Sequence, residues 1–396
     1  MSSQPTTAIL RPGHAERVSA GHPWIYERSI QRFTREPADG EVVQVKDSRK
    51  RFVGIGFHNS KCRVRIRMAA AERVPVDQAY FEERIRAAMA FREKHLSPRD
   101  CYRVVNAEGD FLGGLVVDKY CDILAVQISS LAFNQRRKEL LNALNACLPG
   151  HRIIEIHDAG YRRFEGLPET PETSEKSVSP GRAEISINGL HFSLDLNAGH
   201  KTGAYLDQQA NYLEVGAITN RLQEPRVLDC FSYQGGFSLH AAKHGAIEVL
   251  GLEQNAEAVE LARANATRNH LDDQVRFEQA NVFDWFKSSP KEGFDMIILD
   301  PPSFTRSRAN LPNAARGYKE IHLRALRLLK PGGILTTFSC SHHASREFFL
   351  EVICESAFDA RRQLRLIANH AQPIDHPTLP AVPETDYLKG FSFVVT

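Results

Sequence analysis

The chain of 396 residues carries 50 Lys and Arg against 48 Asp and Glu, and 42% of its residues are hydrophobic. At roughly 150 residues per domain this length predicts two or three domains, and the composition excludes both a disordered chain and a histone-like polycation. The seven cysteines are odd in number, widely spaced and never arranged as CxxC, which argues against a disulfide framework and a zinc cluster. We therefore expect reduced thiols and no metal site.

The amino-terminal residues MSSQPTTAIL contain no basic stretch followed by a long apolar one, so they do not predict a signal peptide. No uncharged apolar run approaches the roughly 18 residues of a membrane-spanning helix. The sequence thus predicts a soluble, cytoplasmic protein without a membrane partner.

Residues 1–74 show short strand patterns separated by glycines, as expected of a compact, barrel-like β-module. Side chains alternate along a strand, so CRVRIRM places its arginines on one face. The module holds 14 Lys and Arg and 7 Asp and Glu, a positive charge that the near-neutral total conceals. A positively charged surface of this kind can bind the phosphates of a nucleic acid. Arginines along a strand can equally form a solvated edge that discourages aggregation.

A second region begins at Pro75 with the helical pattern QAYFEERIRAAMAFREKH. Strands, a glycine turn and a further helical stretch follow, which predicts an α+β region. The region ends in LPETPETSEKSVSPGRAE, whose prolines and lack of periodicity indicate a linker. From about residue 185, strand and helix patterns alternate, which predicts a parallel sheet with helices on both faces.

Polar residues mark the ends of three successive predicted strands. Asp229 precedes a Gly-Gly turn, Glu253 ends EVLGLE, and Asn281 follows the third strand. The dinucleotide fingerprint GxGxxG is missing, so support for a NAD site is weak. The carboxyl ends of parallel strands meet at one edge of a sheet, where these groups fit an adenosine-type ligand. Any one of them alone is better explained as a helix cap.

This arrangement resembles class I S-adenosylmethionine-dependent methyltransferases from about residue 186 onward. The resemblance implies a Rossmann-like domain with S-adenosylmethionine as cofactor. It implies that Asp229, Phe231 and Gly235 hold the methionine part of the cofactor. Glu253 would hold the ribose and Asn281 the adenine amine, although the family more often has Asp at the position of Asn281.

Two later strand ends carry groups suited to a reaction. Asp300 opens the sequence DPPSF, which is similar to the [D/N]PP[Y/F] loop with which methyltransferases commonly grip an amino group, but Ser303 intervenes before Phe304. The next apolar strand leads to Cys340, which adjacent strands would place near Asp300. A thiolate there can add to carbon-6 of cytosine or uracil and so activate carbon-5. The other cysteines have the ordinary character of small buried hydrophobes.

The resemblance extends over nearly the whole chain. AILRPGHAERVSAGHPWIYERSI looks like the opening of a PUA domain, and RVVNAEGDFLGGLVVDKYCDILAVQ resembles the middle module of large-subunit rRNA cytosine-5 methyltransferases. NAGHKTGAYLDQQANY is similar to the GQKTGFFLDQR segment of that family, and DPPSF and TFSCS complete the set. His200 replaces the usual Gln and Gln209 replaces Arg, whereas Lys201, Thr202, Asp207 and Gln208 remain.

This resemblance implies methylation of carbon-5 of a cytidine in 23S rRNA or in a large-subunit ribosomal precursor. Cys340 would be the nucleophile, Asp300 would contact the cytosine edge and the cofactor, and Gln208 would belong to the cofactor site. We expect a PUA RNA-binding domain in 1–74, a central α+β domain with its linker in 75–184 and the methyltransferase domain in 185–396. The sequence also allows a homodimer.

Basic and aromatic residues of the β-module are the expected RNA contacts. Trp24, Tyr26 and Phe57 would offer stacking surfaces. The residues expected to bind RNA phosphates are Lys50, Arg51, Lys61, Arg63, Arg65 and Arg67.

Two alternatives stay open. The chain could methylate another base position (uracil carbon-5, guanine or an exocyclic amine), and in the guanine or amine case Asp300 and Phe304 would grip the base while Cys340 is passive. It could instead be a ribosome-assembly factor that binds RNA without turnover. Full activity of a Cys340→Ser variant would favour amine methylation, and tight RNA binding without methyl transfer would favour the assembly factor.

Overall fold

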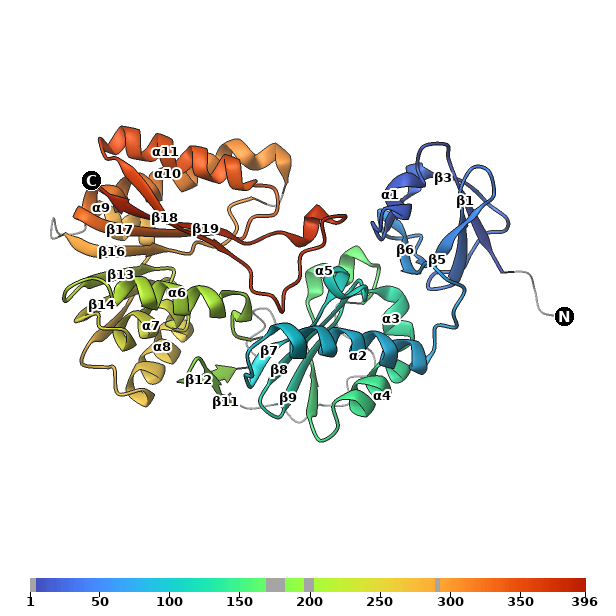
Figure 1. The fold of residues 1–396 in the computed structure, drawn as a ribbon, viewed down its shortest axis with the longest axis horizontal. Helices are drawn as coiled ribbons and strands as arrows, with labels where there is room; N and C mark the ends of the chain where they lie inside the picture. Colours follow the sequence, from blue (N-terminus) through green and yellow to red (C-terminus); the bar gives the residue numbers. More distant parts are fainter. Residues whose placement is uncertain (1–4, 169–181, 196–202, 289–292, 306) are drawn as a thin grey trace. The chain divides into compact units, whose positions relative to one another are not determined.

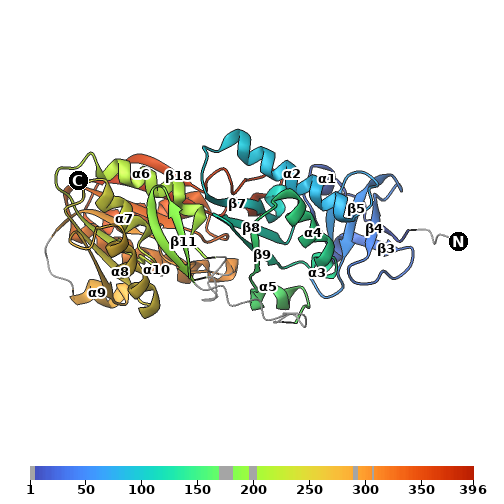
Figure 2. The same cartoon turned by 90° about the horizontal axis from the view of Figure 1, so that it is seen from below.

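The computed structural model describes residues 5–168, 182–195, 203–288, 293–305 and 307–396 (Figure 1 and Figure 2). Its contacts divide the chain into two compact units. The first unit comprises residues 1–183, 194–206 and 374–385, and the second comprises 184–193, 207–373 and 386–396. The segment Ile374–Thr385 thus packs with the first unit although it lies inside the third predicted domain. The boundaries of the three predicted domains stay predictions.

A six-stranded sheet forms the amino-terminal β-module of the first unit, in the order β2-β6-β5-β4-β1-β3. Neighbouring strands are antiparallel except β1 and β4, which run parallel. Apolar residues that include Leu10, Ile25, Val43 and Ile66 form a small core. The elements are β1 (Thr7–Leu10), α1 (Glu16–Ser19), β2 (Trp24–Tyr26), β3 (Ile30–Phe33), β4 (Val42–Lys46), β5 (Phe52–His58) and β6 (Val64–Ala70).

A four-stranded sheet of order β10-β9-β8-β7 and its helices complete the first unit. Helix α2 begins after Asp77, whose carboxylate accepts a hydrogen bond from the Tyr80 N–H at 3.1 Å and so acts as the N-cap. Phe81 and Ile85 of α2 share a core with Leu144 of α4 and with the sheet. The elements are α2 (Gln78–His95), β7 (Cys101–Asn106), β8 (Leu115–Tyr120), β9 (Ile123–Ile128), α3 (Leu131–Gln135), α4 (Arg137–Cys147), β10 (Arg152–Glu155) and α5 (Ala159–Phe164).

Hydrogen bonds to Asp375 fasten the segment Ile374–Thr385 to this unit. The Arg92 guanidinium contacts both carboxylate oxygens of Asp110 and donates to the Asp375 carbonyl at 2.6 Å. The Asp375 carboxylate accepts from the Arg103 N–H at 2.9 Å. Buried charges are tolerated only when they are paired and hydrogen-bonded, so the structure of the first unit depends on this late segment.

A seven-stranded sheet of order β15-β14-β13-β16-β17-β19-β18 is the frame of the second unit. Strands β13 to β17 run parallel, and β19 is antiparallel to both of its neighbours. Helices α10 and α11 lie on one face, and α6, α7 and α8 lie on the other (Figure 1). The sheet confirms the predicted Rossmann-like α/β fold. The strand order reverses between β13 and β16, and doubly wound sheets bind ligands outside the carboxyl ends at such a point.

The elements of this part of the chain are β11 (Arg182–Ile187), β12 (Leu190–Asp195), α6 (Gln209–Thr219), β13 (Arg226–Cys230), α7 (Gly236–Lys243), β14 (Glu248–Glu253), α8 (Ala256–Arg268), β15 (Val275–Gln279), α9 (Val282–Ser288), β16 (Phe294–Leu299), α10 (Leu311–Leu328), β17 (Leu329–Ser339), α11 (Arg346–Ala360), β18 (Leu364–Ala371) and β19 (Lys389–Val395). Among the described residues, no helix is both long and apolar enough to cross a bilayer.

Candidate active site

Asp229 lies near the end of β13 and is fully buried. Its Oδ2 accepts hydrogen bonds from the N–H (3.0 Å) and the hydroxyl (2.6 Å) of Ser238, whereas its Oδ1 has no partner among the described residues. Burial raises the pKa of Asp229 to about 7, against the hydrogen bonds from Ser238, and the nearby carboxylates of Asp300 and Glu253 raise it further. The site therefore holds a buried carboxylate whose charge would be stabilised by a cationic ligand group.

The loop between β13 and α7 is tightly folded. Phe231, Tyr233 and Gly235 have φ values of 66°, 48° and 86°, a left-handed conformation that is uncommon outside glycine and is found at ligand sites. The Tyr233 N–H donates to Oε2 of Glu253 at 3.1 Å, which ties this loop to the end of β14. The hydroxyl of buried Ser232 has no partner within the described part of the chain, so a second polar atom here is available to a ligand.

Glu253 and Asn281 end the next two strands of the sheet, as predicted, but with different partners. Glu253 is half-buried, and its Oε1 accepts from the Asn255 N–H at 2.8 Å. Asn281 is exposed, and its Oδ1 accepts from the N–H groups of Phe283 (3.0 Å) and Asp284 (3.3 Å). Asn281 thus caps α9, and its amide nitrogen, which donates to Oε1 of Gln254 at 3.3 Å, keeps a second N–H for other contacts.

Asp300 follows β16 and lies beside the end of β13. Its N–H donates to the Cys230 carbonyl at 3.3 Å, and its Oδ2 accepts from Nε2 of buried Gln208 at 3.1 Å. The Oε1 of Gln208 accepts in turn from Nδ2 of Asn211 at 2.6 Å. Two residues that the sequence assigned to the same site, Gln208 and Asp300, are therefore in direct contact.

Cys340 directly follows β17 and is half-buried. Strands β16 and β17 are parallel neighbours with Leu299 opposite Thr337, so Asp300 and Cys340 lie at the same edge of the sheet. Their loops also touch, because the hydroxyls of Ser303 and Ser341 are 3.0 Å apart.

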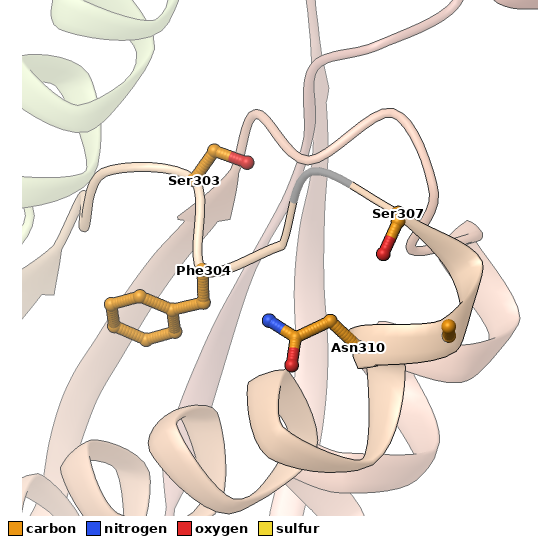
Figure 3. Close-up of a pocket in the computed structure, with 5 residues that line it drawn as sticks. Ser303, Phe304, Ser307 and Asn310 are labelled. Carbon is orange, nitrogen blue, oxygen red and sulfur yellow. The ribbon is translucent and has the colours of Figure 1, made fainter.

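A pocket of about 560 Å³ opens beside these loops (Figure 3). Ser303 and Phe304 line it from the DPPSF loop, and residues at and before the start of α10 line the other side. The latter are Ser307, Ala309 and Asn310. The Phe304 ring lies 4.7 Å from the ring of Tyr318 on α10, which supports the aromatic wall of the pocket from behind. A planar aromatic base is the kind of group that such a wall can stack against.

Two known protein families match different parts of the chain. Residues 8–70 match the PUA-like domain, and residues 174–391, more than half of the chain, match the S-adenosylmethionine-dependent methyltransferase family. The chain belongs to this methyltransferase family. S-adenosylmethionine is therefore its cofactor.

Relatives of this methyltransferase match along nearly its entire length. Proteins from Tolumonas auensis (38% identity, 97% of this chain and 98% of the relative) and Vibrio parahaemolyticus (36%, 98% and 99%) are both named ribosomal RNA large subunit methyltransferase I. A putative methyltransferase from Streptococcus mutans has the same fold, with a TM-score of 0.81 at 23% identity over 98% of this chain and 99% of that one. A second solved structure, of a putative methyltransferase complexed with SAH, has a TM-score of 0.82 at 22% identity, with the same coverage of both chains.

Four of the predicted RNA-binding residues of the methyltransferase are exposed on its β-module: Lys50, Arg51, Lys61 and Arg63. Arg51 forms an ion pair with Asp47 at 2.6 Å but keeps 73% of its side chain exposed. Exposed cations of this kind can reach a phosphate at little cost.

The two remaining arginines face protein carboxylates. Arg65 pairs with Glu27 at 2.8 Å, and Arg67 lies between Glu108 at 2.8 Å and Glu165 at 2.7 Å. The contacts of Arg67 join the β-module to the rest of the first unit. RNA binding by Arg67 would have to break these contacts.

Only part of the predicted aromatic surface is accessible. Trp24 and Tyr26 are half-buried, and the Trp24 indole donates to Glu108 at 2.9 Å. The expectation for Phe57 is wrong: its side chain is 5% exposed and packs edge-on against Phe133 in the core. His200, Lys201 and Thr202 lie outside the described residues.

Sequence reasoning missed Lys389, which opens β19. Its buried ammonium donates to the carbonyls of Ser341 (2.8 Å) and Ala344 (2.6 Å) and so holds the loop after Cys340. Burial lowers the pKa of Lys389, while the charges of Asp386 and Cys340 act in the opposite direction. A lysine directly before the apolar run GFSFVV was the signal that could have identified it.

Close packing at Gly235 gives a stability prediction. A Cβ there would lie 2.7 Å from the Phe277 ring, whereas a Cβ at Gly245, which also has a positive φ (102°), would meet nothing within 4 Å. Gly235→Ala should therefore destabilise the protein by about 1–3 kcal/mol more than Gly245→Ala and should also weaken SAH binding. Denaturation and calorimetric titration of both variants check this, and equal losses would contradict it.

Proposed function

We propose that this methyltransferase transfers a methyl group to carbon-5 of a cytidine in large-subunit (23S) rRNA, with Cys340 as the nucleophile. The observation that carries the proposal is the half-buried Cys340 at the same sheet edge as Asp300, beside a pocket with an aromatic wall. The names of the relatives that match nearly the whole chain, and the PUA-like domain, support rRNA as the substrate.

The residues of the second unit fit S-adenosylmethionine. The amino group of its methionine part would find a partner in the buried Oδ1 of Asp229, and its carboxylate in the Ser232 hydroxyl. Among the described residues of the second unit, these are the two buried side-chain atoms without hydrogen-bond partners. Phe231 and Gly235 shape this loop, and Glu253 would accept the ribose hydroxyls. Asn281 would contact the adenine with its amide nitrogen. Asp300 and Gln208 would close the site toward the substrate.

When bound, S-adenosylmethionine supplies an electrophilic methyl group on a sulfonium. The Cys340 thiolate forms a bond to carbon-6 of cytosine, which breaks the 5,6 double bond and makes carbon-5 nucleophilic. After carbon-5 is methylated, it loses its proton to a base and the sulfur–carbon-6 bond breaks, which restores the double bond and the thiolate. Asp300, oriented by Gln208, would hydrogen-bond to N3 or N4 of the base and stabilise the charge that develops on addition.

We assign RNA binding to residues 1–74, a connecting role to 75–184 and catalysis to 185–396. The RNA is either free 23S rRNA or a precursor particle of the large subunit. A homodimer is also predicted, and analytical sedimentation would measure the oligomeric state.

RNA carrying 5-fluorocytidine tests the chemistry, because fluorine blocks loss of the group at carbon-5 and traps the covalent adduct. We expect a stable protein–RNA adduct that depends on the cofactor, and peptide mass spectrometry should place it on Cys340. An adduct on another residue, or none, would refute the nucleophile. Mass spectrometry of rRNA from a deletion strain identifies the missing methyl group independently.

The exposed cations of the β-module give a second prediction. Lys61→Gln and Arg63→Gln should each weaken RNA binding about two- to fivefold and lower the slope of log K against log salt by about 0.7–0.9, because each removes one phosphate contact. Arg276→Gln is the control, since Arg276 is equally exposed but lies on β15. Unchanged slopes for the first two variants would exclude them from the RNA interface.

Methylation of an exocyclic amine is the second candidate, favoured by Phe304 in the pocket wall beside Asp300. Methyl transfer by the Cys340→Ser variant at the wild-type rate would support methylation of an exocyclic amine.

A further inference from the structure

Both serines that flank Cys340 contact one phenol oxygen. The Tyr318 hydroxyl on α10 lies 2.8 Å from Oγ of Ser339 and 3.0 Å from Oγ of Ser341, and all three side chains are fully buried. The residues on both sides of Cys340 are therefore held by one side chain of α10, which fixes the backbone that carries the thiol. The orientation of the thiol thus depends on Tyr318.

The donor of each hydrogen bond in this group can be deduced by starting from Ser303. Ser303 donates its one hydroxyl proton to the Thr305 carbonyl at 2.9 Å, which can only accept. Ser303 therefore accepts from Ser341, Ser341 accepts from Tyr318, and Tyr318 accepts from Ser339. The chain of four hydroxyls is polarised along its length, and such chains strengthen each member bond.

This hydroxyl chain links the two loops that carry the reacting groups. Ser303 belongs to the loop that begins at Asp300, and Ser341 belongs to the loop of Cys340. Serine stands where the [D/N]PP[Y/F] pattern has its aromatic residue, and its hydroxyl is the group that contacts Ser341. Lys389 holds the same loop from β19 through the Ser341 carbonyl.

Packing keeps Tyr318 in place. Its ring lies 4.7 Å from that of Phe304 and 5.1 Å from that of Phe349, and its carbonyl oxygen is 2.6 Å from Nδ1 of buried His322. Burial raises the pKa of Tyr318, and the charges of Cys340 and Asp300 raise it further. The phenol accordingly stays protonated and remains a donor to Ser341.

We propose that Tyr318 is a positioning residue, which acts through Ser341 and Ser303 to fix the Cys340 thiol relative to the Asp300 carboxylate so that both meet the same base. This inference rests on the proposed function, in which Cys340 attacks carbon-6. Tyr318 itself is fully buried and would act through these serines.

The test is the Tyr318→Phe variant, which removes the hydroxyl and keeps the ring. Displacement of a reacting group by about 1 Å can cost 10²-fold in rate, so we expect kcat and the rate of 5-fluorocytidine adduct formation to fall about 10- to 100-fold. The KM for RNA and the Kd for SAH should stay within twofold. The control is Tyr80→Phe, which also removes a buried tyrosine hydroxyl. This hydroxyl donates to the Ala69 carbonyl at 3.0 Å and belongs to the first unit, not to the unit that carries the site.

Ser303→Ala provides an independent readout, because the Ser303 side chain is exposed and its loss does not threaten folding. Ser303→Ala should lower kcat by a smaller factor than Tyr318→Phe does. The double variant should be no slower than Tyr318→Phe alone, because both substitutions interrupt the same chain of hydroxyls. If Tyr318→Phe and Ser303→Ala both retain kcat, or if only the KM changes, the positioning role is wrong. Activity in Cys340→Ala would instead overturn the proposed function, so the two failures are distinguishable.

Discussion

Replacing Cys340 with alanine is expected to lower kcat for methyl transfer at least about 10³-fold, because carbon-5 of cytosine is too weak a nucleophile without addition at carbon-6. Binding of SAH and of RNA should stay within twofold, since the change removes only a sulfur atom at a half-buried position. Single-turnover transfer of a labelled methyl group, with the two affinities measured separately, checks both statements.

Cys354→Ala is the matched control, since this exposed cysteine lies on α11 away from the strand ends. It should keep the wild-type rate. A Cys340→Ala variant within tenfold of wild type would contradict covalent catalysis and would favour direct methylation of an amine gripped by Asp300 and Phe304.

Replacing Asp229 with asparagine is expected to weaken SAH binding about 10- to 100-fold at pH 8, the size of one charge-assisted hydrogen bond. Asparagine keeps the shape and an acceptor for Ser238, so the fold should be retained. Titration calorimetry measures the affinity, and Glu257→Gln on the exposed face of α8 is a control that should change nothing.

The ionisation of Asp229 also predicts how SAH affinity changes with pH. The pKa of Asp229 is raised to about 7, so in the free protein its contribution to stability is complete below about pH 4 and is lost as the pH rises through 7. A cationic ligand group favours the ionised form, so SAH affinity should increase about five- to tenfold between pH 6 and 7.5. Asp229→Asn should remove both dependences. A wild-type affinity that is flat over this range would show that Asp229 does not meet the amino group.

The sequence was sufficient to predict the Rossmann-like sheet and the strand ends that carry Asp229, Glu253, Asp300 and Cys340. These positions follow from apolar runs and from the rule that parallel strands present their carboxyl ends at one edge. Local pattern determines both features, so no knowledge of distant contacts was needed.

Contacts between distant residues were not predictable. Arg63 and Arg67 occupy equivalent places in the alternation of the predicted strand CRVRIRM, yet Arg63 is exposed and Arg67 meets Glu165, 98 residues away. Tyr318 looks like an ordinary core residue of an amphipathic helix, because nothing near it in the sequence shows that its hydroxyl reaches Ser339 and Ser341. Phe57 was misjudged for the same reason, since its neighbour Phe133 comes from another module.

The late segment Ile374–Thr385, whose Asp375 meets Arg92 and Arg103 in the first unit, has a consequence for biosynthesis. Proteins usually fold from the amino terminus as domains emerge from the ribosome, but here the amino-terminal part stays incomplete until residue 385 has been translated. A fragment ending near residue 183 would carry Arg92 without its full set of acceptors. Folding of the first unit and of the second unit should therefore finish together, and neither unit should be recoverable as a contiguous piece of the gene.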